Sequence, residues 1–192
     1  MARDGSNTLR LVTIEPDAKN WTWVLERKCD ECGFDTRSFP PEEIGRLSRE
    51  AAEPWHALLA HPLVRVRPTD NCWSALEYGC HVRDVFRLGL HRLQRMLHED
   101  DPRFENWDQD ETAVTDRYDQ QDPGEASAEL LAAAAELADA YDAVASDEWR
   151  RPGMRSDGAP FTVESFGRYF LHDPMHHLVD VRRGLAALTG EA

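Results

Sequence analysis

The sequence predicts an all-α protein, a four-helix bundle with an irregular N-terminal arm. Four long segments repeat apolar residues at the three- and four-residue spacing of a helix. The segments between them are rich in Pro, Gly and Asp, which interrupt helices. The chain has 192 residues, of which 41% are hydrophobic, so it suits one domain with a real core. We place the arm at 1–39 and the bundle at 40–192.

The first two helices have clear boundaries. Helix one is predicted over 41–60, with a proline pair at its start and Pro62 beyond its end. Helix two is predicted over 73–98, with Asn71 or Ser74 as its N-cap. The apolar stripe of helix two consists of Val82, Val85, Phe86, Gly89, Leu93 and Met96.

The remaining helices follow a long loop. Helix three is predicted over 125–146, and a turn-rich crossover that suits a hairpin follows over 147–161. Helix four is predicted over 162–188, with Gly190 past its end. Four long helices suggest that the architecture is a bundle.

The acidic connection over 99–124 is unusually long for a compact domain. It contains Trp107-Asp108-Gln109-Asp110-Glu111. We interpret this stretch as a solvated connector, and a lid over a site is the alternative.

The arm has no sustained periodicity, and we expect it to pack on the bundle with one short strand near 21–25. Its Cys29-x-x-Cys32 pair is interpreted as packing thiols, with half of a metal site or a redox pair as alternatives. A zinc site needs a second close pair, and Cys72 and Cys80 are eight residues apart. The sequence leaves the role of Cys29 and Cys32 open.

Composition limits the classes of function. The formal net charge is −14, which repels phosphate backbones, so we expect no nucleic-acid partner. No run approaches 18 apolar residues and the N-terminus has no apolar signal segment, so we expect no membrane partner and a cytoplasmic location.

Helix four carries the densest group of metal-binding residue types, His172-Asp173-Pro174-Met175-His176-His177. Residues four apart share a helix face, which gives two ligand pairs, His172 with His176 and Asp173 with His177. His177 falls inside the apolar stripe that should face the bundle interior. However, Pro174 can kink the helix and turn the other pair inward, so both pairs remain candidates.

A His-x-x-Asp-Val pattern occurs on two helices, as His81 to Val85 and His177 to Val181. An aspartate three residues after a histidine can orient the imidazole for metal binding. We therefore predict His81 and His177 as ligands, with Asp84 and Asp180 as their orienting groups. The alternative for His81 is a histidine at the edge of the core that bonds a neighbouring carbonyl or Asp84.

These residues carry a resemblance to a known family. Trp73-Ser74-Ala75-Leu76-Glu77-Tyr78-Gly79-Cys80-His81 resembles the start of helix two in the DinB superfamily, and the segment from Asp173 to Asp180 resembles its second metal motif. The resemblance covers about residues 41–188. It departs from the family pattern at Asp173, where His or Glu is more usual, and at Pro174.

The resemblance implies a bundle that holds one divalent ion, most often zinc or nickel. The implied ligands are His81, His177 and Asp173, with His172 or His176 as alternatives to Asp173. Related members include mycothiol-dependent maleylpyruvate isomerases and thiol S-transferases. The resemblance implies that the metal-bound water or thiol is the reactive species, and it implies no catalytic side chain.

The first functional hypothesis is therefore a metal-dependent thiol S-transferase or isomerase that joins a mycothiol-type thiol to a small electrophile. The second is a metal-dependent hydrolase on the same site. The third is a non-catalytic metal-binding module of a stress response. Burial of a helix face in a homodimer is also compatible with a bundle of this size.

Overall fold

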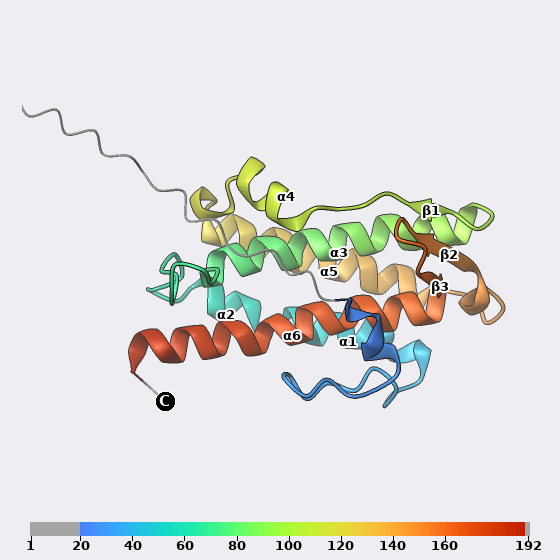
Figure 1. Ribbon diagram of the computed structural model, residues 1–192, viewed down its shortest axis with the longest axis horizontal. Coiled ribbons are helices and arrows are strands. Elements are labelled where there is room, and N and C mark those ends of the chain that lie inside the picture. Colours follow the sequence, from blue (N-terminus) through green and yellow to red (C-terminus); the bar gives the residue numbers. More distant parts are fainter. Residues whose placement is uncertain (1–19, 191–192) are drawn as a thin grey trace, which may run out of the picture.

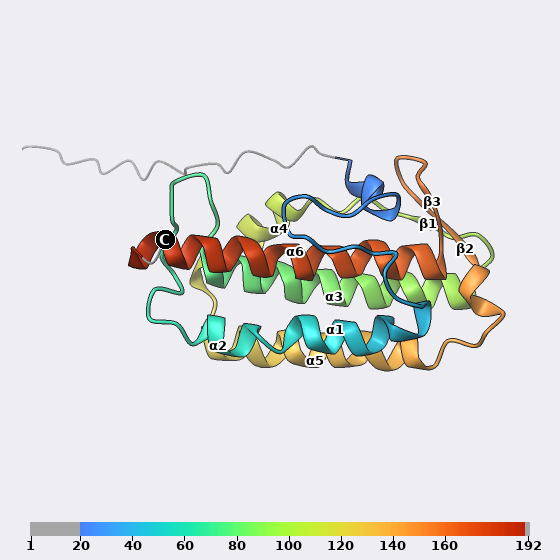
Figure 2. The same cartoon turned by 90° about the horizontal axis from the view of Figure 1, so that it is seen from below.

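The computed structural model describes residues 20–190. Four helices packed side by side form its body (Figure 1). They are α1 (Ile44–Ala52), α3 (Ala75–His98), α5 (Pro123–Asp142) and α6 (Val163–Thr189). α5 packs against α1 and α3, and α6 packs against the same two helices from the other side. Figure 2 shows α3 and α6 in one layer and α1 and α5 in the other. The prediction of a four-helix bundle is confirmed.

The first predicted helix is interrupted. A 3-10 turn over Pro41–Glu43 leads into α1, and a separate short helix, α2 (Trp55–Leu59), follows it. The predicted continuous helix over 41–60 is therefore wrong. Pro54 lies at the break, where proline supplies no N–H for the preceding turn.

α3 and α6, the two helices that carry the site, both begin at a capping box. Ser74 caps α3 and accepts from the Glu77 N–H, while Thr162 caps α6 and accepts from the Ser165 N–H. α6 continues through Pro174 without interruption. Pro174 therefore does not break this helix into two.

A three-stranded sheet closes one end of the bundle. β2 (Pro152–Arg155) and β3 (Pro160–Thr162) form the hairpin expected between helices three and four. β1 (Arg103–Phe104) pairs in parallel with β2. The long acidic connection is thus attached to the hairpin, and it also contains α4 (Gln109–Thr115) and a 3-10 turn over Tyr118–Gln120.

The described part of the arm, 20–39, packs along α6 (Figure 2). The strand predicted near 21–25 is wrong, because Trp21–Leu25 forms a 3-10 helix whose Asn20 cap accepts from the Thr22 N–H. Arg168 of α6 donates to the Thr36 carbonyl. Residues 1–19 of the predicted arm lie outside the described residues. Within 20–190, no helix has both the length and the apolarity to cross a membrane.

Candidate metal centre

Three side chains from two helices meet in the bundle. α3 contributes His81, and α6 contributes Asp173 and His177. One donor atom from each lies within 4.8 Å of the other two. We call these three residues the bundle site. Their meeting follows from the sequence, because Asp173 and His177 are four residues apart on the face of α6 that packs on α3.

The donor atoms of His81 and Asp173 are buried, and the half-buried His177 faces them. His81 is fully buried, and its Nε2 lies 3.4 Å from Asp173 Oδ1. His177 Nε2 lies 3.7 Å from the same oxygen. Neither ring nitrogen of His81, nor Asp173 Oδ1, has a hydrogen-bond partner among the described residues. Buried polar atoms without partners are costly, and a divalent cation would accept lone pairs from His81 Nε2 and Asp173 Oδ1.

The charge of Asp173 suits a cation. Burial alone would raise the pKa of Asp173, but the imidazoles of His177 and His81 hold it at about 2. The residue is therefore a carboxylate at neutral pH. One carboxylate with two imidazoles is a donor set that transition metals such as zinc accept.

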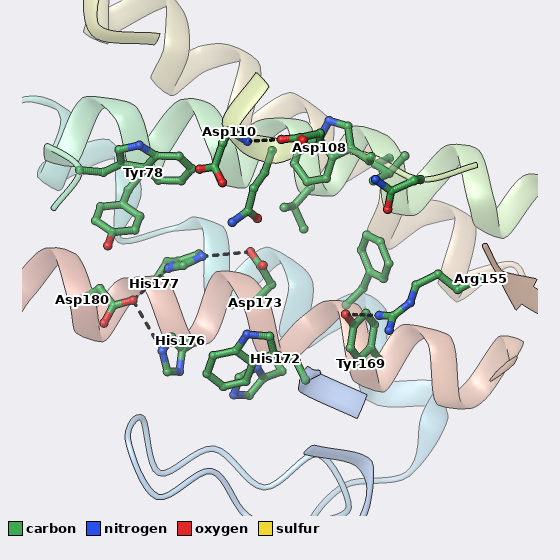
Figure 3. Close-up of a pocket in the computed structure, with 18 of the residues that line it drawn as sticks. Tyr78, Asp108, Asp110, Arg155, Tyr169, His172, Asp173, His176, His177 and Asp180 are labelled. Atoms are coloured by element: carbon green, nitrogen blue, oxygen red, sulfur yellow. Dashed lines mark hydrogen bonds and ion pairs between the residues drawn. The ribbon is translucent and has the colours of Figure 1, made fainter. Parts of the chain in front are cut away.

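Asp180 orients His177. The Asp180 carboxylate can only accept, so His177 Nδ1 carries the proton and donates across 3.0 Å. This leaves the lone pair on Nε2, the nitrogen that faces Asp173. Asp180 thus makes the hydrogen bond to His177 that its predicted orienting role requires (Figure 3).

The corresponding prediction for Asp84 is wrong. Its carboxylate accepts from Arg83 and from the Tyr118 hydroxyl instead of from His81. The guanidinium is a charge-assisted partner, and it also donates to Glu129 of α5. His81 is held by aromatic rings: Trp107 stacks on it at 5.4 Å and Trp73 lies 5.2 Å away.

The other helix-four pair does not join His81. His172 and His176 lie on a different side of α6, beside Cys29 and Cys32 of the arm. These four residues, which we call the arm site, also bring one donor atom each within 4.8 Å of the others. The sequence placed the two cysteines and the two histidines in separate segments, about 140 residues apart, so no local spacing could join them.

A cavity of about 660 Å³ opens beside the bundle site. The acidic connection supplies one wall, because residues 106–110 line the cavity and Trp107 covers His81. The interpretation of this stretch as a solvated connector is therefore wrong. Arm residues Trp21 and Glu31 line the cavity as well.

The cavity also has a cationic part that sequence analysis missed. Arg92 is buried, and among residues 20–190 its guanidinium pairs with no carboxylate. It donates to the Glu105 carbonyl and lies against the Phe104 and Phe170 rings. Burial lowers the pKa of Arg92 to about 10, so it remains charged at neutral pH. Arg155 donates to the Tyr169 hydroxyl nearby (Figure 3), but its charge is paired with the Asp157 carboxylate.

Comparisons with known proteins agree with this architecture. A family model described as the DinB superfamily matches residues 42–180. YfiT from Bacillus subtilis, described as a probable metal-dependent hydrolase with an unusual four-helix bundle topology, has a similar structure with a TM-score of 0.70. The two share 16% sequence identity, and the match covers 80% of this chain and 91% of YfiT. No curated protein matches the chain.

Proposed function

The chain belongs to the DinB superfamily, and from that premise we propose that it is a metal-dependent enzyme acting on a small anionic molecule in the cavity. His81, Asp173 and His177 would hold the ion. The observation that carries the proposal is that His81 Nε2 and Asp173 Oδ1, both buried and without a hydrogen-bond partner among the described residues, meet His177 Nε2 beside the cavity. Zinc and nickel are the ions that we expect there.

A bound divalent ion would supply Lewis acidity, which lowers the pKa of a water or thiol and polarises an electrophile. The protein's own residues do the positioning. Asp180 fixes the tautomer of His177, and the rings of Trp73 and Trp107 fix the plane of His81. Asp173 contributes the only negative charge of the bundle site, so a bound dication keeps a net positive charge.

The charge of Arg92 in the cavity indicates the substrate class. Arg92 is charged, buried and without a carboxylate partner in the described part of the chain, which favours an anionic group on the ligand. Tyr169, one helical turn before Asp173 on α6, lines the same cavity and accepts from Arg155. A substrate would thus place its anionic group near Arg92 and its reacting atom near the bundle site.

Two reactions fit this arrangement. Thiol transfer or isomerisation with a mycothiol-type thiol is the first candidate, because about 660 Å³ is ample for a thiol and a small electrophile together. Hydrolysis is the second, and it is favoured by the similarity to YfiT, a probable metal-dependent hydrolase.

The test is an activity screen of metal-loaded protein against anionic electrophiles and esters, with and without added thiol, beside His177→Ala. Turnover that needs both metal and thiol supports the transferase, and turnover that needs metal alone supports the hydrolase. Protein that carries stoichiometric metal but turns over neither class, with or without thiol, would argue against an enzyme.

Arg92→Met tests the anionic substrate class. We expect KM for an anionic substrate found in that screen to rise about 10- to 100-fold, because a charge-assisted contact of about 1.5–3 kcal/mol is lost. Metal content should not change. Arg95→Met is the matched control, since Arg95 pairs with Glu99 outside the cavity. Equal KM values for the two variants would contradict the role of Arg92.

A further inference from the structure

The arm site has the composition and the geometry of a second metal centre. Its donors are the thiols of Cys29 and Cys32 and the imidazoles of His172 and His176. We propose that these four residues bind a structural zinc ion that attaches the N-terminal arm to α6. This site is separate from the bundle site and does not depend on the proposed enzyme activity.

The distances suit a tetrahedral ion. Cys29 Sγ lies 3.7 Å from His176 Nδ1, and Cys32 Sγ lies 3.6 Å from His172 Nε2. Zinc–sulfur bonds of about 2.3 Å and zinc–nitrogen bonds of about 2.0 Å at tetrahedral angles give a sulfur–nitrogen separation of roughly 3.5 Å. The four donors therefore need to move little to share one zinc ion.

The local structure presents the donors in pairs. The two cysteines lie in a tight turn in which the Gly33 N–H donates to the Cys29 carbonyl and the Cys29 N–H donates to the Phe34 carbonyl. Gly33 has a φ of 76°, which favours glycine at the end of this turn. His172 and His176 are one helical turn apart on α6. The structure thus supplies the second close pair that the cysteine spacing alone lacks.

The donor types select the metal. Thiolates with imidazoles are the ligands of structural zinc, whereas magnesium and calcium need oxygen. Cys29, His172 and His176 are buried, and with four protein ligands no position remains for a substrate. The other ring nitrogen of His176 faces Asp180 and Glu31, at 3.6 and 3.7 Å, as outer carboxylates face metal-binding histidines.

The two sites share α6, and their ligand pairs on this helix are offset by one residue. The pair of His172 and His176 precedes that of Asp173 and His177 by one position, which is a rotation of about 100° around the helix. Figure 3 shows Asp173 and His177 on the side of α3 and His172 and His176 on the side of the arm. A single helix can therefore hold a closed structural site and an open reactive one.

The proposed zinc would fix one wall of the cavity. Trp21 packs on both arm-site imidazoles, with ring centroids 5.3 Å from His172 and 5.0 Å from His176. Trp21 and Glu31 both line the cavity beside the bundle site. Holding the turn around Cys29 and Cys32 on α6 would keep these two residues in place.

The first test is metal content by mass spectrometry on full-length protein from zinc-supplemented culture, purified without chelator. We expect two ions per chain in wild type, and one each in His81→Ala/His177→Ala and Cys29→Ser/Cys32→Ser. Cys72→Ser is the matched control and should keep both, because Cys72 belongs to neither site. The inference fails if His81→Ala/His177→Ala carries no zinc, or if Cys29→Ser/Cys32→Ser keeps as much as Cys72→Ser.

The second test identifies the ligands by spectroscopy, which needs no cysteine variant to fold. Cobalt(II) added to zinc-free His81→Ala/His177→Ala should give a thiolate-to-cobalt charge-transfer band and the strong visible bands of a tetrahedral ion. A weak spectrum without the charge-transfer band would overturn the inference. Because this variant lacks the bundle site, either result is independent of the proposed enzyme.

Attachment of the arm can be measured by proteolysis. Arg27 and Lys28 are exposed and directly precede Cys29. We expect trypsin to cut there about tenfold faster or more in Cys29→Ser/Cys32→Ser than in Cys72→Ser, because the turn is no longer held on α6. Equal rates would show that no ion holds the arm.

Discussion

Glu77 joins the start of α3 to the chain that precedes it. Its carboxylate accepts from the Ser74 N–H and from the Arg67 guanidinium, and only 3% of the residue is exposed. Burial raises its pKa, but the bonds from Arg67 and Ser74 outweigh burial and hold the pKa below its usual value. The charge of Glu77 therefore stabilises the turn of α3 that leads to His81.

Glu77→Gln should lower the free energy of unfolding by about 1–3 kcal/mol at pH 7, because glutamine keeps an acceptor for Ser74 but loses the charge. A lowered folded-state pKa gives stability that is present above the unfolded pKa of about 4.3 and is lost as pH falls through the folded pKa. The difference between wild type and variant, measured in urea, should therefore shrink below about pH 4. A difference that stays constant with pH would contradict a role for the charge.

At the residue scale, helical spacing predicted which candidate ligands share a helix face. It did not predict which groups the neighbouring carboxylates bond. The four-residue spacing of Asp173 and His177 places both on the face that meets His81. The same logic failed for Asp84, because Arg83 and Tyr118 compete for its carboxylate. Tyr118 lies in the long connection, whose path the sequence pattern does not determine.

Among the elements, α1 and α5 approach closely at Gly45. A Cβ atom added there would lie 2.1 Å from Asp142 Oδ1 and 2.7 Å from the Ala138 carbonyl oxygen. The carboxylate can move, but the carbonyl belongs to the backbone of α5. This contact therefore requires glycine.

Gly45→Ala should destabilise the protein by about 1–3 kcal/mol, despite the better helix propensity of alanine, because α1 and α5 must separate. Gly124→Ala, in the first turn of α5, is the matched control. Its Cβ would meet only Asp122 Oδ1, at 3.1 Å, so the change should stay within about 0.5 kcal/mol. Thermal unfolding of the two variants compares them directly, and equal losses would rule out this packing argument.

At the element scale, long amphipathic helices were predictable and short elements were not. α3, α5 and α6 carry their periodicity over five or more turns, so their extents could be predicted. β1 has two residues and exists only because it pairs with β2, about 50 positions later. The break between α1 and α2 had a local signal, Pro54, which the helical periodicity around it obscured.

For the whole molecule, the charge balance is the main long-range effect. The formal net charge is −14, from 36 acidic and 22 basic residues. Repulsion among the excess carboxylates opposes the compact state, and added salt screens it. We therefore expect the midpoint of thermal unfolding to rise by about 2–4 °C between low salt and about 0.3 M NaCl, equivalent to about 1 kcal/mol. A falling midpoint would mean that surface ion pairs outweigh the net charge.

The tryptophans have a consequence for how ion binding can be observed. The ring centroid of Trp21 lies 5.3 Å from that of His172 and 5.0 Å from that of His176, and Trp23 lies 6.5 Å from His172. Trp73 and Trp107 flank His81 of the bundle site. Each group of donors thus has its own indole fluorophore. An open-shell ion such as copper(II) or cobalt(II) would quench the emission of the indole beside which it binds. In Trp21→Phe/Trp23→Phe, the quenching that remains would report the bundle site, so the order in which the two sites fill could be followed by fluorescence.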